Sequence, residues 1–307
     1  MSPNRDRALS LIRGMPLSFV GRPVHGGCWG AQSVNNMNNV LDIDDHNLEE
    51  ALQLVATFGS DRYGYIVTPN VDHIIRHHED GHFRALYAQA AYVLLDSRFF
   101  AHTVGLIKRQ MLRVCLGSDL TTAILDSIIK PLDVAILVGG TPEQAQILQE
   151  RYGLMRLHHI DPPMNFIRDP LAVETCLREI EAMSPFRFCF LAIGSPQQEI
   201  IAQKLKERGI ARGLALCVGA AINFLTGIER RAPLWVQEAG FEWLYRLSRD
   251  PRRLWKRYLV HGPKIFILLW RIELRVRRSP PPGISWEVPV PGNTATQEKV
   301  PIASVPR

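Results

Sequence analysis

The sequence predicts an α/β fold built around a mostly parallel sheet, followed by a basic, helical C-terminal appendage. Short apolar runs alternate with helical stretches as far as about residue 226, which is the pattern of repeated βαβ units. Each apolar run stops at a Gly, Pro or Asp, as a strand does where the chain turns into a loop. After Gly227 the pattern changes to closely spaced helical segments rich in arginine.

The apolar runs place the predicted strands at Tyr65 to Val67, Tyr92 to Leu95, Val134 to Val138, Phe188 to Ile193 and Leu214 to Val218. Helices are expected between them, with starts after Asn70, at Thr141-Pro142 and at Ser195-Pro196. In parallel sheets, ligands bind outside the carboxyl ends of the strands. We therefore expect one rim to carry the residues that follow the strands: Thr68, Asn70, Asp96, Gly139, Gly140, Gly194, Gln198 and Gly219.

Length and charge predict one folded domain with an appendage. The chain has 307 residues, of which 46% are hydrophobic, enough for a sizeable core. Residues 227–278 contain 13 Lys/Arg against 5 Asp/Glu, a net of +8, whereas the whole chain carries +6. This block predicts an anionic partner: phosphate, nucleic acid or an anionic membrane. The expected organisation is a flexible lead (1–36), the α/β domain (37–226), the appendage (227–278) and a Pro-rich disordered tail (279–307).

The compartment is predicted from cysteine use and from the absence of long apolar runs. The start of the chain lacks the apolar core of a signal peptide. The longest apolar run, Ile265 to Trp270, is far shorter than the ~20 residues that span a bilayer. Five scattered cysteines without metal spacing indicate reduced core residues of a cytoplasmic protein. They are Cys28, Cys115, Cys176, Cys189 and Cys217.

The appendage is predicted to contain an interfacial helix. Helices are expected to begin at Pro233, at Asp250-Pro251 and at Pro263. The last of them would present the apolar run Ile265 to Trp270 opposite a stripe formed by Arg271, Arg275 and Arg278. An apolar face beside a basic stripe is typical of helices that lie on an anionic membrane.

Six sequence blocks carry a family resemblance. In order they are Thr68-Pro69-Asn70-Val71-Asp72-His73, Leu95-Asp96-Ser97-Arg98, Gly117-Ser118-Asp119-Leu120, Leu137-Val138-Gly139-Gly140-Thr141-Pro142, Gly194-Ser195-Pro196-Gln197-Gln198-Glu199, and a last block from Arg231 to Tyr258. With these blocks the chain resembles the WecG/TagA/CpsF glycosyltransferases (family 26), from about Asn38 to Tyr258.

The resemblance implies a Rossmann-like catalytic domain and an inverting, metal-independent enzyme without a cofactor. Its donor would be a UDP-sugar and its acceptor a sugar linked to polyprenyl (undecaprenyl) diphosphate, in cell-surface or exopolysaccharide synthesis. The appendage would help to close the active site and reach the inner face of the bacterial plasma membrane. Off the membrane, such proteins are expected to form a homo-oligomer that covers the active-site face.

The resemblance also implies roles for single residues. Asp96 matches the proposed catalytic base, which takes a proton from the acceptor hydroxyl. From the residues alone, a turn-capping Asp is the alternative. Thr68, Asn70 and Gln198 match substrate-contacting positions, with helix capping and a solvated first turn as their alternatives.

The diphosphate of the donor needs neutralising groups if no metal is present. Gly139 and Gly140 precede a helix N-terminus, which favours anions, although many strand-to-helix turns use glycine. The basic candidates are Arg231, Arg246, Arg253 and Lys256; for each of them, a solvated or membrane-facing position is the alternative.

Three local features qualify the resemblance. Relatives often have Asp-Gly where this chain has Asp96-Ser97, and Arg where it has Val114, so Arg113 either substitutes or the donor contacts differ. Asp42-Ile43-Asp44 looks like a metal-binding Asp-x-Asp motif, but it precedes a helix-capping pattern and is interpreted as structural.

Two other functions were weighed. A Rossmann-type nucleotide-binding oxidoreductase would need a Gly-x-Gly-x-x-Gly fingerprint after an early strand, and Thr68-Pro69-Asn70 is not one. A nucleic-acid-binding protein would use the basic block, but that block is rich in Leu, Ile and Trp on its other face, which suits a membrane better. We therefore expect no nucleic-acid partner.

Overall fold

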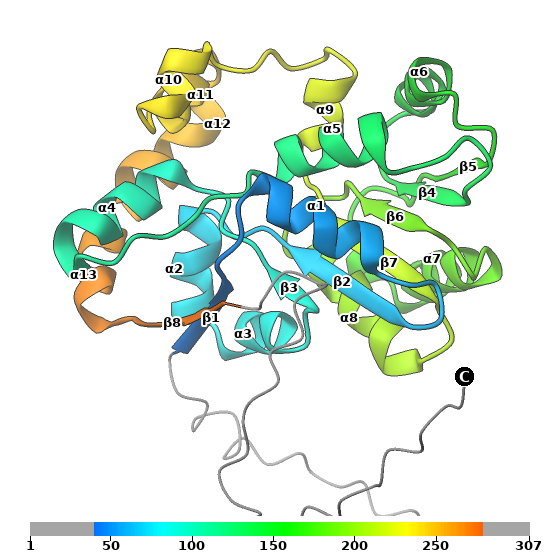
Figure 1. The fold of residues 1–307 in the computed structure, drawn as a ribbon, viewed down its shortest axis with the longest axis horizontal. Coiled ribbons are helices and arrows are strands. Elements are labelled where there is room, and N and C mark those ends of the chain that lie inside the picture. Colours follow the sequence, from blue (N-terminus) through cyan, green and yellow to red (C-terminus); the bar gives the residue numbers. More distant parts are fainter. Residues whose placement is uncertain (1–39, 279–307) are drawn as a thin grey trace, which may run out of the picture. The chain divides into compact units, whose positions relative to one another are not determined.

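The computed structural model describes residues 40–278, which form one α/β unit in the order shown in Figure 1. The predicted lead (1–36) and tail (279–307), together with Cys28, lie outside the described residues. The strands are β1 (Val40–Asp44), β2 (Tyr63–Val67), β3 (Tyr92–Val93), β4 (Ala135–Val138), β5 (Leu157–Ile160), β6 (Phe188–Leu191), β7 (Gly213–Cys217) and β8 (Glu273–Arg277).

The helices of the body are α1 (Leu48–Thr57), α2 (Val71–Glu79), α3 (Gly81–Ala88), α4 (Arg98–Lys108), α5 (Gly117–Ser127), α6 (Pro142–Tyr152), α7 (Pro170–Ala182), α8 (Gln197–Arg208) and α9 (Ala221–Leu225), with a 3-10 turn at Phe166–Arg168. Those of the appendage are α10 (Leu234–Glu238), α11 (Glu242–Arg249), α12 (Pro251–Trp255), a π-helical turn (Lys256–His261) and α13 (Lys264–Arg271).

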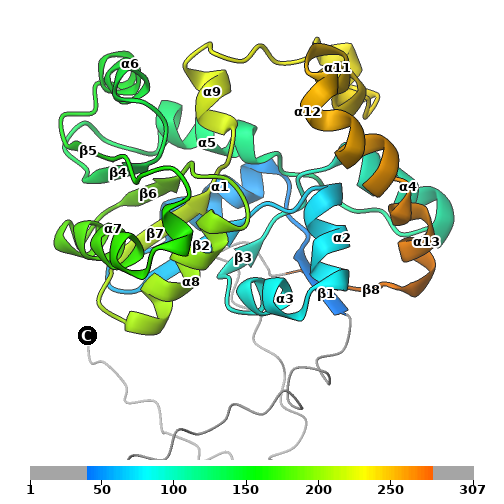
Figure 2. The ribbon, with the colours of Figure 1, turned by 180° about the vertical axis from the view of Figure 1, so that it is seen from behind.

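The central sheet confirms the predicted fold class. Its six strands are all parallel and run in the order β3-β2-β7-β6-β4-β5. Side chains of successive strand residues alternate between two buried clusters, as period-two geometry requires. One cluster packs under α1, α5, α6 and α9, and the other under α2, α3, α7 and α8 (Figures 1 and 2). The result is a three-layer sandwich in which the sheet is covered on both faces.

Local sequence signals explain several helix starts. Asn47 and Glu50 form the expected capping box at α1. In the Asp-x-Asp segment before them, Asp44 accepts from Val93 N at 2.7 Å and binds Arg277, which are structural contacts. Thr141 caps α6 with Pro142 at its first position, as expected.

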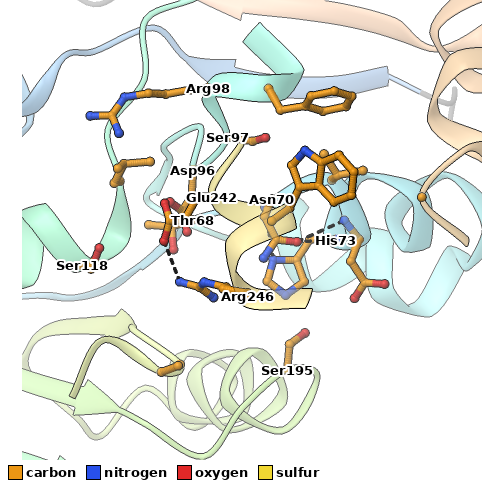
Figure 3. A pocket seen from close by; sticks show the side chains of 18 of the residues that line it. Thr68, Asn70, His73, Asp96, Ser97, Arg98, Ser118, Ser195, Glu242 and Arg246 are labelled. Atoms are coloured by element: carbon orange, nitrogen blue, oxygen red, sulfur yellow. Dashed lines mark hydrogen bonds and ion pairs between the residues drawn. The ribbon is translucent and has the colours of Figure 1, made fainter. Parts of the chain in front are cut away.

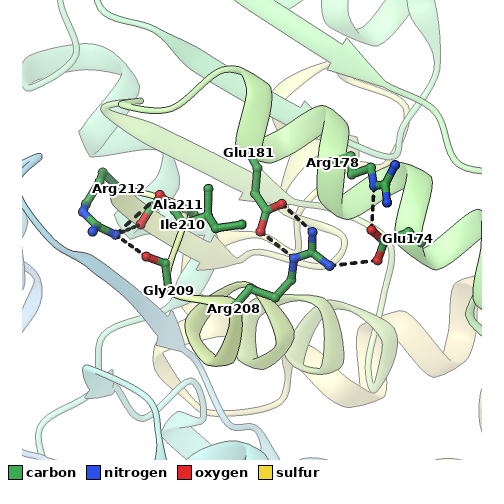
Figure 4. Close-up of polar contacts among 8 residues, drawn as sticks. All are labelled: Glu174, Arg178, Glu181, Arg208, Gly209, Ile210, Ala211 and Arg212. Carbon is green, nitrogen blue, oxygen red and sulfur yellow. Dashed lines mark hydrogen bonds and ion pairs between the residues drawn. The ribbon is translucent and has the colours of Figure 1, made fainter. Parts of the chain in front are cut away.

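On the other face of the sheet, α7 and α8 are joined by an ion-pair network in which Arg208 binds both Glu181 and Glu174 (Figure 4).

The predicted arginine stripe of the last helix is wrong. Helix α13 ends at Arg271, and Arg275 belongs to strand β8, which pairs in parallel with β1. The spacing of Arg271, Arg275 and Arg278, four and three residues apart, is compatible with one face of a helix. In the structure, however, Arg275 lies in an extended strand. Arg277 and Arg278 bind Asp44 and Asp45, each at 3.0 Å, so they neutralise buried carboxylates.

The apolar run of α13 is divided between two environments. Ile265, Leu268 and Leu269 are buried, and α13 contacts α2 of the body. Ile267 and Trp270 are exposed by 66% and 79%. Only part of the expected apolar face is therefore available for another surface.

Candidate active site

A pocket of about 670 Å³ lies at the carboxyl ends of β2, β3, β6 and β7, where the body meets the appendage (Figure 3). The strand-end turns contribute Thr68, Asn70, Asp96, Gly194 and Gly219. Helix α11 and the segment before α13 complete the wall with residues that include Glu242, Trp243, Arg246 and Pro263. Most of the rim predicted from the strand ends therefore forms one side of this pocket, whereas Gly139 and Gly140 are not among its lining residues.

Asp96 lines this pocket at the carboxyl end of β3. Its backbone N–H donates to Pro69 O at 2.9 Å, which fixes the turn after β3 against the turn after β2. Its carboxylate accepts a hydrogen bond from the backbone N–H of Gly117, the first residue of α5. The side chain is aimed into the pocket, and burial raises its pKa from the usual 3.8 to about 7.

Two charged neighbours from the appendage act on Asp96 in opposite directions. The positive charge of Arg246 lowers the pKa of Asp96, while the negative charge of Glu242 raises it. These residues bind each other along one face of α11, with Arg246 Nη2 and Glu242 Oε1 3.0 Å apart. The Arg246 guanidinium also lies over the ring of Phe224, 4.9 Å from its centroid. The appendage thus sets part of the electrostatic environment of the strand-end carboxylate.

A sequence model of the Glycosyl transferase WecG/TagA/CpsF family matches residues 37–279. This range contains the whole described fold, with both the sheet and the pocket-lining appendage. The chain belongs to this family. It is therefore a glycosyltransferase, and membership indicates a sugar-nucleotide donor and a lipid-linked acceptor in cell-surface polymer synthesis.

In this glycosyltransferase, Thr68 and Asn70 both face the pocket and also hold local structure. Thr68 Oγ1 lies 3.5 Å from Cys217 O, which links the ends of β2 and β7. The Asn70 side chain accepts from Asp72 N at 3.0 Å and caps α2. The capping alternative for Asn70 is therefore present together with its position in the pocket.

Gln198 lies at the pocket wall but is only 3% exposed. Its Oε1 accepts from Gly219 N and its Nε2 donates to Glu199 Oε1, both at 3.0 Å. Burial raises the pKa of Glu199. In this conformation, the Gln198 amide oxygen holds the turn after β7, and its amide nitrogen is engaged by Glu199 of the same helix.

Among the remaining predicted site residues, those whose side chains the structure describes lie outside the pocket lining. Gly139 and Gly140 follow β4, where both have positive φ, and Gly139 packs against Ala192 and Ile193. Arg231 binds Asp119 in the first turn of α5 and so joins the start of the appendage to the body. Lys256 lies over the ring of Trp255 on the exposed surface. Arg253 belongs to α12, but its side chain is outside what the structure describes.

The structure also answers the question raised by Arg113. Its guanidinium binds Glu50 at the surface, and its backbone N–H donates to Asp45 at 2.8 Å. Val114 packs against the core. Neither residue reaches the pocket lining, so Arg113 does not substitute at this site.

Sequence reasoning missed several polar residues of the pocket: Arg76, Arg98, Ser118, Ser195 and Glu242. None of them directly ends a strand, which was the signal used. Arg98, Ser118, Ser195 and Glu242 fall inside the quoted sequence blocks, but no role was assigned to them. A search for polar residues one or two positions beyond each strand-end turn would have found Arg98 and Ser195, but not Arg76, Ser118 or Glu242, which lie in α2, α5 and α11.

Two further observations concern the part of the chain from residue 40 to residue 278. No group of three or more His, Cys, Asp or Glu side chains is arranged there to hold a metal ion. None of the helices in that range is both long and apolar enough to cross a bilayer. Cys115, Cys176, Cys189 and Cys217 are free and buried, as predicted.

Proposed function

We propose that this glycosyltransferase moves a sugar from a UDP-sugar to a polyprenyl-diphosphate-linked acceptor, inverts the anomeric centre without a metal ion, and uses Asp96 as the base. The observation that carries the proposal is the position of Asp96 in the pocket with a pKa of about 7. A general base is most effective when its pKa is close to the working pH. At pH 7 about half of such carboxyls are ionised, and the ionised form is basic enough to accept a proton.

In the proposed step, the acceptor hydroxyl attacks the anomeric carbon of the donor while Asp96 removes its proton. A new carbon–oxygen bond forms on one face of the sugar, and the bond to the diphosphate breaks on the other. The electron pair leaves with UDP. Attack from the opposite face inverts the configuration.

The appendage supports the proposal by placing charge beside the reacting centre. Arg246 comes from α11 and lines the pocket next to Asp96. A cation in a site shielded from water stabilises developing negative charge more strongly than it would in water. Arg246 is thus suited to a phosphate group of donor or acceptor, and Glu242 holds the guanidinium in place.

The lipid-linked acceptor fits the apolar part of the pocket. Its apolar lining comes from Trp243, Leu259, Pro263 and Phe266 of the appendage and from Phe99 of α4. Phe266 belongs to α13, whose neighbouring Ile267 and Trp270 are exposed. An apolar wall that continues into exposed apolar side chains supports entry of a lipid carrier from a membrane surface.

We further propose that the enzyme binds peripherally to the inner face of the bacterial plasma membrane through this surface. Replacing Ile267 and Trp270 by serine is expected to reduce binding to anionic vesicles, because apolar area is lost from the contact. Leu171→Ser is the matched control, since Leu171 is 74% exposed on the body. Equal vesicle binding by the double variant and the control would contradict this assignment.

The reaction is tested by measuring UDP release with an undecaprenyl-diphosphate-linked sugar, a panel of UDP-sugars and a chelator. We expect acceptor-dependent release that survives chelation, and its loss in Asp96→Asn. The exposed Asp61 supplies a control, Asp61→Asn, which should remain active. Folded, vesicle-bound protein that releases UDP with none of the donors would refute the proposed reaction. Full activity in Asp96→Asn would refute the role of the base.

A further inference from the structure

Three arginines line the pocket, and they differ in their partners. Arg76 binds Asp72 at 3.0 Å and Ser195 Oγ at 3.2 Å, and Arg246 binds Glu242 at 3.0 Å. Arg98 has no carboxylate within ion-pair distance in the part of the chain that the structure describes. Its Nη1 atom is buried and lacks a hydrogen-bond partner there. Of these three arginines, Arg98 is therefore the one whose charge no described carboxylate matches.

A buried guanidinium nitrogen without a partner is costly, since it has lost water and gained nothing in return. Such a group is retained where a ligand supplies the missing acceptor. Arginine presents its donors as a rigid fork that matches the oxygen atoms of phosphate or carboxylate. The missing partner is therefore expected to be an anion.

The position of Arg98 is fixed by its own turn. Ser97 caps α4, with Ser97 Oγ accepting from Phe100 N at 3.1 Å, and this places Arg98 at the first helical position. Arg98 follows Asp96 by two residues, and in the view of Figure 3 Asp96 lies between Arg98 and Arg246. Base and cation are thus held by one short, capped segment.

The N-terminus of α5 adds positive potential to the same part of the pocket. Leu116 precedes the helix without a side-chain cap, and Leu116 and Ser118 both line the pocket. The first N–H of the helix, from Gly117, binds Asp96 itself. The acidic Asp119 in this turn is neutralised by Arg231. An anion between Arg98 and this helix end would receive both a guanidinium and a helix dipole.

Resting on the proposed function, we propose that Arg98 binds the diphosphate of the nucleotide-sugar donor, so that the Asp96-Ser97-Arg98 turn carries both the base and the cation for the leaving group. In an in-line displacement, a base that touches the attacking oxygen lies roughly 5–7 Å from the leaving oxygen. Residues two positions apart with one long side chain cover that distance. As the bond between the anomeric carbon and the diphosphate breaks, Arg98 neutralises the charge that remains on UDP.

The test is calorimetric binding of UDP and of uridine, with chelator present, to wild type and to Arg98→Met. We expect the variant to bind UDP at least tenfold more weakly, as is typical for a lost hydrogen bond to a charged group, and uridine equally well. Arg113→Met is the matched control, because Arg113 binds Glu50 away from the pocket, and it should bind UDP like wild type.

Melting curves distinguish binding from a structural role. Removing an unpartnered buried cation should leave the melting temperature of the ligand-free protein unchanged or higher, while the rise caused by UDP is lost. Arg98→Lys retains the charge without the fork and should give an intermediate affinity for UDP.

Several results would overturn the inference. Unchanged UDP affinity in Arg98→Met is one, and an equal loss for uridine is another. A loss seen with UDP-glucuronate but absent with UDP and UDP-glucose would assign Arg98 to a sugar carboxylate instead of the diphosphate. In these cases the proposed function stands. Wild type that binds neither UDP nor any UDP-sugar would refute both.

Discussion

Replacing Asp96 by asparagine should make the folded protein more stable, and increasingly so as the pH rises. Burial raises the pKa of Asp96 from the usual 3.8 to about 7, so the folded state holds a proton that the unfolded state has released. Between about pH 4 and pH 7 the folded protein therefore binds more protons than the unfolded chain. Stability contributed by this site falls through that window and stays low above it.

The magnitude follows from the size of the shift. About three pH units at roughly 1.4 kcal/mol each give an upper value of about 4 kcal/mol. Asp96 is partly exposed to the pocket interior, and water there screens the charge, so we expect roughly 2 kcal/mol. Asp96→Asn should thus equal wild type near pH 4 and exceed it by about this amount at pH 8.

The assay is urea denaturation of both proteins at a series of pH values. Because wild type and Asp96→Asn differ only at residue 96, the difference between their free energies of unfolding reports on Asp96 and not on other titrating groups. Asp61→Asn serves as the exposed control. A difference that does not change with pH, or one that favours wild type as the pH rises, would refute the raised pKa.

In parallel, wild-type kcat/KM should increase with pH to a plateau with a midpoint of about 7, because only the ionised base acts.

Three further variants test separate parts of the structure. Glu242→Gln removes a negative neighbour of Asp96 and leaves Arg246 less neutralised, so the midpoint of the pH–activity profile should move to lower pH; a midpoint that rises or stays contradicts this. Gly117→Ala places a Cβ 2.7 Å from Thr68 Oγ1, so we expect a loss of roughly 1–3 kcal/mol in the free energy of unfolding and a fall in kcat. Unchanged stability and kcat would show that this contact relaxes freely. Arg208→Ala breaks the network between α7 and α8 and should cost roughly 1 kcal/mol by urea denaturation with kcat unchanged; a lower kcat at full folding would argue for coupling to the site.

The central strands were predictable because they are buried on both faces. β4 and β6 consist entirely of buried residues, and runs of this kind are visible in the sequence. β5 was missed because its two middle residues are half-buried histidines at the sheet edge, which interrupt the apolar run. β1 and β8 were missed because their pairing joins Val40 to Glu273, and no local pattern encodes contact across such a separation.

The candidate site could be predicted as far as it depends on strand ends. Thr68, Asn70 and Asp96 follow strands that local sequence identifies, and parallel topology brings them together. Glu242 and Arg246 enter the pocket only because the appendage packs over the rim. Arg246 was found through the family resemblance alone. Glu242 lies in the same resembling block but was given no role, and an i,i+4 pair on a helix is usually a surface feature.

Strand β8 attaches the C-terminal end of the appendage to the body, so the appendage is held at both of its ends. The first attachment is the ion pair between Arg231 and Asp119. The second is the pairing of β8 with β1, together with the ion pairs from Arg277 and Arg278 to the buried Asp44 and Asp45. Two attachment points restrict the appendage to small movements over the pocket, whereas a segment attached at one end could move away from it as a unit. Cutting the chain after Gly227 would also leave the edge of β1 unpaired and Asp44 and Asp45 without their arginines. The contribution of the appendage to lipid binding or self-association is therefore better measured by point substitutions on its exposed side than by deleting it.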